Sequence, residues 1–385
     1  MKKLIALILA AVLCMAACVA MAADLKVGVI LVGDETEGYT LAHMNGIKAA
    51  AANLGLADNQ IVWKYKVPED QSCYDAALDL VGQGCNVIIS NSYGHQTYMV
   101  EAAAEYEDVT FVAMTGDFAA ISGLDNFKNA FTKVFEARYI SGVVAGMKLA
   151  ELLESGELSP EKQPNSFDAD GNVKIGYVGA FNYAEVVSGY TAFFLGLRSI
   201  VPNVTMEVMY TNSWFDIDKE AATAEALIAK GCVIIGQHAD STGAPAATQK
   251  LLDAGNVCYS VGYNVDMLPT APTAALTSPT NEWSVFYTEL FTAVQNGDEI
   301  AADWAKGFGA DAVAITVPTL DYGYVPTSAQ ETMLLEYKSE LDVVRSKIIV
   351  GELSVDAWDE ALAKYYEMGY AQVVEDMVAY IESNR

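Results

Sequence analysis

Short apolar runs alternate with longer amphipathic stretches through the first third of the chain. The runs at residues 25–32, 86–90 and 109–114 are almost continuously apolar, which is typical of strands buried on both faces. A further strand is predicted at residues 61–67. The intervening stretches have helical spacing, at residues 41–54, 74–82 and 97–106. Strands that alternate with helices in this way indicate right-handed βαβ units and a parallel sheet.

The same pattern returns in the middle of the chain. LVGQGCNVIIS and LIAKGCVIIG both pass from a helical pattern through a Gly-Cys pair into an apolar strand. Lys26 lies 58 positions before Gly84, and Lys174 lies 57 positions before Gly231. The second copy predicts strands at 173–178, 205–210, 233–237 and 258–262, with helices at 189–199, 219–230 and 246–254. The predicted fold class is α/β, with two lobes that are each a doubly wound parallel sheet. A cleft between such lobes is where a small ligand is expected.

The remaining segments suggest how the lobes are completed. A long helix is predicted at 137–155, a polar surface loop at 155–172, a helix at 281–296, a strand at 312–317, and helices at 332–350 and 355–385. We expect lobe 1 to comprise residues 24–136 plus about 265–318. Lobe 2 is expected to comprise 137–264 plus about 319–350, with 351–385 as a C-terminal helical extension.

The first 23 residues have the pattern of a secretory signal peptide. Lys2 and Lys3 precede an apolar run at 4–13, and small residues lead to Ala23. The apolar run is too short for a permanent membrane span. An alternative cleavage before Cys18 would give a lipoprotein anchored through that residue. In either case the sequence predicts an exported, periplasmic protein.

Composition excludes several classes of function. The net charge is −28 and hydrophobic residues make up 52% of the chain, so we expect a folded protein that repels nucleic-acid polymers. The G-x-S-x-G, H-E-x-x-H, Walker A and EF-hand motifs are missing from the sequence. GFGADA at 307–312 fits G-x-G-x-x-A, but it precedes a predicted strand, whereas a dinucleotide-binding loop follows one. Its three histidines, His43, His95 and His238, are far apart along the chain. We therefore expect no enzyme activity, no metal and no cofactor, and a monomer.

Four cysteines follow the predicted signal peptide: Cys73, Cys85, Cys232 and Cys258. Their spacing does not match a zinc site. Cys232 and Cys258 each open a predicted strand, and a disulfide between those neighbouring strands is possible in an oxidising compartment. The alternative is that all four are buried thiols.

Candidate binding residues follow the carboxyl ends of the predicted strands, where open parallel sheets bind their ligands. The selected residues are Tyr39, Tyr93, Phe181, Glu185, Trp214, His238, Asp240, Asn264, Asp266 and Trp283. Aromatic faces combined with amide and carboxyl groups suit a planar, polar heterocycle.

Several of these residues have purely structural alternatives. Asp240 could cap the following helix, and Asn264 and Asp266 could form Asx turns. Trp214 could pack within its lobe, and Trp283 begins an apolar helical stripe that is typical of a core. His43, at a helix-interior position, is interpreted as structural.

Several motifs together resemble the basic membrane protein (BMP) family of substrate-binding proteins, over about residues 26–351. The motifs are GYTLAH, EARYISGVVAG, KIGYVGAFNYAEVVSGYTAFFLG, TNSWFDIDKE, GQHADS, VGYNVDM and LTSPTNEW. They are most similar to the branch with a G-W-T-x-x-H loop, which is associated with purine bases such as adenine. The resemblance implies a type I periplasmic binding protein that hands a purine or nucleoside to an ABC permease.

The resemblance also implies roles for individual residues. Tyr39 lies where the family places a stacking tryptophan, and Trp214 matches the aromatic residue of its N-S-W-F-D motif. Asp240 and Asp266 match polar residues that line the family's cleft. An amide such as that of Asn264 could pair with the base through two hydrogen bonds.

The sequence leaves alternatives open for the ligand and for the role of the protein. The nucleoside branch carries an acidic residue at the end of the first strand, whereas this chain has Ile30 and Leu31 there, which disfavours ribose binding. A ligand-sensing partner of a membrane receptor would have the same fold. A nucleoside hydrolase would need a metal or carboxylate cluster, for which the sequence gives no clear sign.

Overall fold

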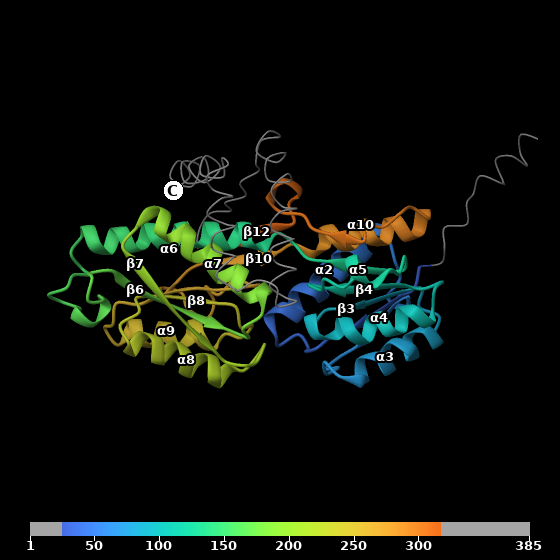
Figure 1. The fold of residues 1–385 in the computed structure, drawn as a ribbon, viewed down its shortest axis with the longest axis horizontal. Coiled ribbons are helices and arrows are strands. Elements are labelled where there is room, and N and C mark those ends of the chain that lie inside the picture. Colours follow the sequence, from blue (N-terminus) through green and yellow to red (C-terminus); the bar gives the residue numbers. More distant parts are fainter. Residues whose placement is uncertain (1–24, 317–385) are drawn as a thin grey trace, which may run out of the picture. The chain divides into compact units, whose positions relative to one another are not determined.

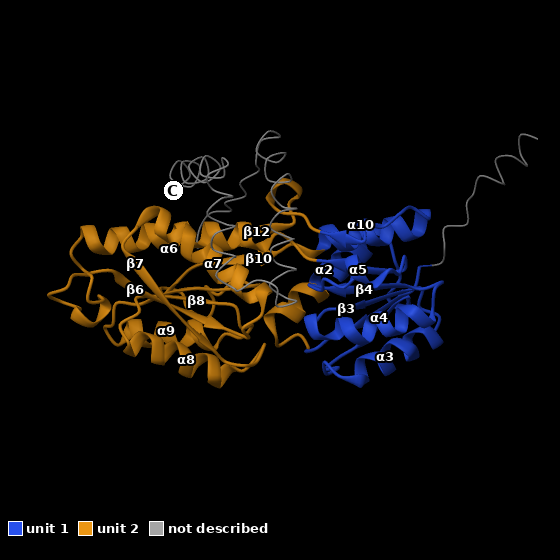
Figure 2. Ribbon diagram, in the orientation of Figure 1, with its two compact units in different colours: residues 1–33, 45–130, 284–304 blue, residues 34–44, 131–283, 305–385 orange. Residues whose placement is uncertain are grey.

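Two compact units make up residues 25–316, the part of the chain that the computed structural model describes (Figure 2). Within this range, unit 1 contains residues 25–33, 45–130 and 284–304, and unit 2 contains residues 34–44, 131–283 and 305–316. Each unit has its own sheet, so the chain is two α/β domains as the internal repeat predicted.

The sheet of unit 1 has six strands in the order β11-β5-β4-β3-β1-β2 (Figure 1). Their bounds are β1 Val27–Ile30, β2 Ile61–Lys64, β3 Val87–Ser90, β4 Thr110–Met114, β5 Phe127–Ala130 and β11 Asp303–Trp304. All neighbouring pairs run parallel, and Val27 is paired with both Ile61 and Val87. The central strands are apolar because both faces are covered.

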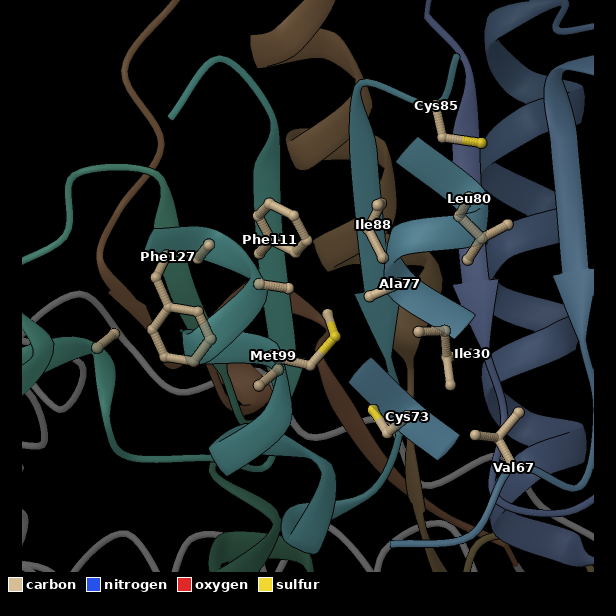
Figure 3. Close-up of a cluster of buried hydrophobic side chains, with 14 residues drawn as sticks. Ile30, Val67, Cys73, Ala77, Leu80, Cys85, Ile88, Met99, Phe111 and Phe127 are labelled. Atoms are coloured by element: carbon tan, nitrogen blue, oxygen red, sulfur yellow. The ribbon is translucent and has the colours of Figure 1, made fainter. Parts of the chain in front are cut away.

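Helices cover both faces of this sheet. The helices are α2 Gly38–Leu54, whose first residues belong to unit 2, α3 Gln71–Gly82, α4 Gln96–Glu105, α5 Ala119–Ser122 and α10 Trp283–Asn296. Leu80 of α3 and Met99 of α4 pack with Ile88 and Phe111 of the sheet in a fully buried cluster (Figure 3). This core accounts for the buried faces of α3 and α4.

The sheet of unit 2 has the order β12-β10-β9-β8-β6-β7. Its strands are β6 Val173–Gly179, β7 Val204–Tyr210, β8 Ile234–Gln237, β9 Tyr259–Val261, β10 Ala275–Asn281 and β12 Val313–Thr316. β12 runs antiparallel to β10, and the other pairs are parallel. The carboxyl ends of β6 to β10 therefore share one edge, which carries the candidate residues of this unit.

The helices of unit 2 are α6 Val134–Glu154, α7 Ala184–Ile200, α8 Ile217–Ala229 and α9 Gly243–Asp253. α6 and α7 lie on one face of the sheet and α8 and α9 on the other (Figure 1). Glycines allow α6 and α7 to touch through their backbones. A Cβ atom on Gly142 would lie 2.0 Å from the Phe193 carbonyl oxygen, and one on Gly196 would lie 2.0 Å from that of Tyr139. Larger residues would force the helix pair apart.

Two predictions about the segments that complete the lobes were wrong. β10 and β12 belong to the second sheet, whereas residues 265–318 were assigned to lobe 1; within that range, residues 284–304 do belong to unit 1. Residues 34–44 and 131–136 also belong to unit 2 by their contacts. Strands β5, β10 and β11 were not predicted. β10 has the sequence ALTSPTN, whose proline and hydroxyl residues conceal a strand that is nonetheless mostly buried.

Some predictions concern residues outside the described range. These are the signal peptide at 1–23, lipidation at Cys18, the lobe 2 segment at 319–350 and the extension at 351–385. Among residues 25–316, none of the helices is long and apolar enough to cross a membrane.

The four described cysteines are separate buried thiols, so the Cys232–Cys258 disulfide considered from the sequence is not formed. The register of β8 with β9 pairs Ile234 with Tyr259, which leaves the two cysteines one position out of step. The Cys258 thiol instead donates to the Thr248 carbonyl of α9 at 3.5 Å. Neighbouring strands were predicted correctly, but their register was not visible in the sequence.

We expect all four of these cysteines to be alkylated when the unreduced protein is unfolded in the presence of iodoacetamide. Peptide mass spectrometry would show each cysteine labelled, with a reduced sample as the control. In the native protein labelling should be slow, because burial raises the pKa of the Cys73 and Cys232 thiols to about 12. A cross-linked peptide containing Cys232 and Cys258 would contradict the expectation.

Candidate binding site

The loops that follow the strands of unit 2 are tied to one another at the carboxyl edge of the sheet. The backbone N–H of Asp240, after β8, donates to the Trp214 carbonyl, after β7, at 2.8 Å. The Gly38 N–H, at the start of α2, donates to the Asp240 carbonyl at 3.3 Å. Asp240 thus lies at the junction of three segments that are distant in sequence, and most of the candidate residues surround it.

An aromatic cluster lies at the ends of β6 and β7. The rings of Phe181 and Tyr183 stack with centroids 5.1 Å apart, and Phe181 meets Trp214 edge to face at 4.9 Å. Phe181 and Trp214 are half-buried and Tyr183 is exposed. Within residues 25–316 the Trp214 indole N–H is buried without a hydrogen-bond partner. A ligand could stack on the apolar faces of these rings.

A chain of polar side chains starts at the Asp240 carboxyl group. The Asn264 amide donates to Asp240 Oδ1 at 2.6 Å, and the Asn281 amide donates to Asn264 Oδ1 at 2.9 Å. The Thr132 hydroxyl donates to Asn281 Oδ1. Asp240 therefore does not cap α9, where Ser241 Oγ accepts from the Gly243 N–H instead. The capping interpretation of Asp240 was wrong, because its side chain points to this amide chain.

A second buried network joins α6, α7 and β8. The Arg138 side chain, 1% exposed, donates to the Gln237 carbonyl and contacts His238 Nδ1 at 3.2 Å. Its guanidinium carbon lies 3.5 Å from the centre of the Tyr263 ring. His238 Nε2 contacts Glu185 Oε1 at 2.9 Å. Glu185 and His238, both candidates, are thus bound to each other and to Arg138.

Donor and acceptor roles in this network follow from the arginine. Arg138 can only donate, so His238 Nδ1 accepts and His238 Nε2 carries the hydrogen that is donated to Glu185. Burial lowers the pKa of His238, and the guanidinium lowers it further, while Glu185 acts in the opposite direction. The imidazole is therefore neutral at pH 7, and the Arg138 and Glu185 charges are linked through it.

The Asp240 carboxyl group lies in an environment that disfavours its charge. Burial raises the pKa of Asp240 well above its ordinary range, and the Glu37, Glu220 and Glu185 carboxylates raise it further. Arg138 opposes these effects. Asp240 is 5% exposed and Glu37 is 4% exposed, so water does little to screen them from each other.

Tyr39, His43 and Trp283 form an aromatic group at the start of α2. The His43 ring stacks on Trp283 at 4.3 Å, and Tyr39 meets the His43 ring edge to face at 4.5 Å. Trp283 is 1% exposed and His43 is fully buried, which lowers the pKa of His43 well below its usual value. Ring contacts with the buried His43 and Trp283 therefore hold the half-buried Tyr39 in place.

Two further candidates are Asp266 in unit 2 and Tyr93 in unit 1. Asp266 is exposed and accepts from the Leu268 N–H at 3.0 Å, which is the Asx turn considered from the sequence. Tyr93 belongs to unit 1, where it begins a single 3-10 turn, Tyr93–His95, after β3. Asn264, by contrast, is buried and bonded to Asp240 rather than forming such a turn.

Sequence reasoning did not single out Arg138, Glu37 or Asn281. Arg138 is a cation within the apolar run of EARYISGVVAG, and a charge in such a run signals a buried partner. Glu37 stands among other acids in GDETEGYT, and nothing in the pattern distinguishes it from the exposed Glu35. Asn281 belongs to the strand β10, which was not predicted.

Comparison with known proteins identifies the chain's relatives. Residues 166–359 match the family model of PnrA-like ABC transporter substrate-binding proteins, Bmp. The chain is 32% identical over 274 residues to a purine-binding protein of Brucella abortus, covering 71% of this chain and 69% of that protein. It is 30% identical over 323 residues to a putative ABC transporter glucose-binding protein, TsgA13, of Haloferax volcanii, covering 83% of this chain and 70% of that protein.

A solved structure shares the fold. A solute-binding protein of an ABC transporter system from Aeropyrum pernix K1 has a TM-score of 0.65 with this chain, at 15% sequence identity. The match covers 89% of this chain and 98% of the other. The predicted class, two α/β domains of the periplasmic binding protein type, is confirmed.

Proposed function

Since this chain belongs to the Bmp family of PnrA-like ABC transporter substrate-binding proteins, we propose that it captures a purine base or nucleoside outside the cytoplasmic membrane. It then delivers the ligand to a membrane permease. The purine-binding relative from Brucella abortus supports the ligand class, and Bmp membership supports the permease partner.

The observation that carries the purine proposal is the combination of side chains around Asp240. Trp214 and Phe181 provide aromatic faces, and the buried Asp240 and Asn264 provide directed hydrogen bonds beside them. A purine has two flat faces and an edge of alternating donors and acceptors, so it uses both kinds of group. Tyr39, supported by His43 and Trp283, would supply a further face.

The polar residues have distinct roles in this proposal. Asp240 and Asn264 meet the edge of the base. Arg138, His238 and Glu185 are linked to one another by hydrogen bonds, so we assign them to positioning the loop after β8 rather than to contacting the ligand. In this proposal Glu185 and His238, which the sequence predicted to bind the ligand, instead position the loop.

A thermal-shift panel tests the ligand class. We expect adenine at about 100 times its dissociation constant to stabilise the protein by about 2.7 kcal/mol, raising the melting temperature by several degrees. The panel would include adenosine, guanine and D-glucose at equal concentrations. A response to D-glucose alone would refute the purine proposal.

D-Glucose belongs in the panel because of the glucose-binding name of the Haloferax relative. Aromatic faces beside carboxyl and amide groups can also hold a sugar ring. Glucose is therefore the second candidate ligand, and the panel separates the two directly.

A further inference from the structure

We propose that Asp240 meets the ligand as a neutral carboxylic acid, kept in that form by its burial and by the neighbouring Glu37, and that the site thereby selects purines whose edge presents a donor beside an acceptor. This inference rests on the proposed purine-binding function. It names Glu37 as a residue that determines specificity and adenine as the preferred base.

The Asp240 carboxyl group has no paired cation among the described residues. Its Oδ1 atom accepts from the neutral Asn264 amide, and within residues 25–316 no lysine or arginine forms an ion pair with it. Arg138, the cation that acts on Asp240, is occupied by the Gln237 carbonyl and His238. A buried carboxylate without a partner cation is costly, so the group favours its protonated form.

The contacts of its segment bring Glu37 close to Asp240. The Gly38 N–H, next in sequence, donates to the Asp240 backbone, which holds Glu37 close to Asp240. Glu37 is buried, and its Oε2 accepts from the Thr40 hydroxyl. Asp240 is the carboxyl group whose pKa burial and the Glu37 charge raise well above its ordinary range, so the proton is assigned to Asp240.

Most other ionisable groups around Asp240 raise its pKa or are neutral, and Arg138 is the exception among them. Glu220 of α8 and Glu185 of α7 add negative charge, while Arg138 of α6 opposes them. His238, after β8, has its pKa lowered by burial, and Tyr263, after β9, has its pKa raised by burial. Among these groups the acids outnumber the single cation, so Asp240 remains the site of protonation.

The hydrogen-bonding edge of a purine decides which form of a carboxyl group it pairs with. Adenine presents its 6-amino donor beside the N1 or N7 acceptor, and a neutral carboxylic acid matches either pair through its carbonyl and hydroxyl. An ionised carboxylate offers acceptors only, so it suits the adjacent N1–H and 2-amino donors of guanine. The protonation state of Asp240 therefore distinguishes the two bases.

The experiment measures adenine affinity by calorimetry from pH 5 to pH 9 for the native chain, Asp240→Asn and Asp240→Ala. An asparagine amide copies the donor and acceptor of a neutral acid without its titration. We expect native affinity to fall by about tenfold per pH unit above the pKa of Asp240, because only the protonated form pairs with adenine. Asp240→Asn should abolish this dependence and bind adenine more tightly than the native chain at pH 9, whereas Asp240→Ala should weaken binding throughout.

Glu37→Gln tests the cause of the protonation. Removing the neighbouring negative charge lowers the pKa of Asp240, so the fall in adenine affinity should begin at a lower pH. Glu35→Gln, in the same loop but exposed, is the matched control and should leave the pH profile unchanged. A profile that does not move in Glu37→Gln would remove Glu37 from the proposal.

The outcomes separate this inference from the proposed function. If no purine stabilises the protein, the function itself fails. If adenine binds but Asp240→Asn loses affinity as Asp240→Ala does at both pH 5 and pH 9, the carboxylate is the binding form and only this inference is overturned. Should Asp240→Asn not fold, a native affinity for adenine that rises with pH has the same meaning.

Discussion

Arg138→Ala is expected to destabilise unit 2 by about 3–5 kcal/mol, because it removes one partner of a buried charged network. The guanidinium is 1% exposed, so solvent does not replace its contacts with the Gln237 carbonyl and His238. Without it, the buried Glu185 carboxylate keeps its contact with the His238 imidazole but loses the nearby positive charge. Urea unfolding followed by circular dichroism would measure the loss.

Arg198→Ala provides the matched control for that substitution. Arg198 lies on α7, which packs against α6, but its side chain is exposed and lies over the Phe194 ring at 5.4 Å. A surface change of this kind usually alters stability by less than about 0.5 kcal/mol. Equal losses for the two variants would show that burial of Arg138 is not the source of the effect.

The alternating pattern of the sequence predicts most of the fold because each βα unit buries its own apolar residues. Strand β3 and the helix α3 before it were predicted within a few residues of their observed bounds. Such elements are specified locally, by apolar runs and by turns such as that at Gly84, which has a positive φ.

The elements that were missed depend on distant partners. β5, with the sequence FKNA, is a strand because it pairs with β4 and β11, and its Asn129 side chain is buried against the Ala113 carbonyl. β10 likewise carries buried Thr277 and Ser278, whose polar groups give no apolar signal. Tertiary pairing overrides local propensity at these strands.

The candidate site was predictable only at the level of its loops. The rule that ligands bind at the carboxyl ends of parallel strands located Trp214, Asp240 and Asn264, which the structure ties together around Asp240. The rule cannot tell which polar residues satisfy one another. Glu185 and His238 fulfil the same positional criterion, yet their side chains are used by Arg138, a residue from a different part of the sequence.

Glu37 is a residue that the positional rule did not select, although it lies near Asp240 in the structure. The nearby acids in sequence are the half-buried Asp34 and the exposed Glu35, and the hydrogen bond from Gly38 to the loop after β8 brings Glu37 near Asp240. Glu37 affects the charge of the site because the contacts of its segment bring it there. Chemistry of this kind is set by burial and distance, which sequence spacing does not encode.

Trp214→Ala is expected to weaken purine binding by about 1–3 kcal/mol, or roughly 5-fold to 150-fold, if the indole stacks on the base. The half-buried ring already meets Phe181 edge to face, and its buried N–H has no hydrogen-bond partner among residues 25–316. Its backbone carbonyl would still accept from the Asp240 N–H, so the loop after β8 should keep its anchor. Calorimetric titration with adenine measures the change.

Trp63→Ala is the matched tryptophan control. Trp63 lies on β2 of unit 1, where it is half-buried and stacks on Tyr65 at 6.2 Å, so its loss should leave adenine affinity unaltered. Trp214→Phe should recover part of the affinity, since phenylalanine restores a face for stacking but not the indole donor. Native affinity in Trp214→Ala would show that the aromatic cluster after β6 and β7 packs the domain and does not hold the base.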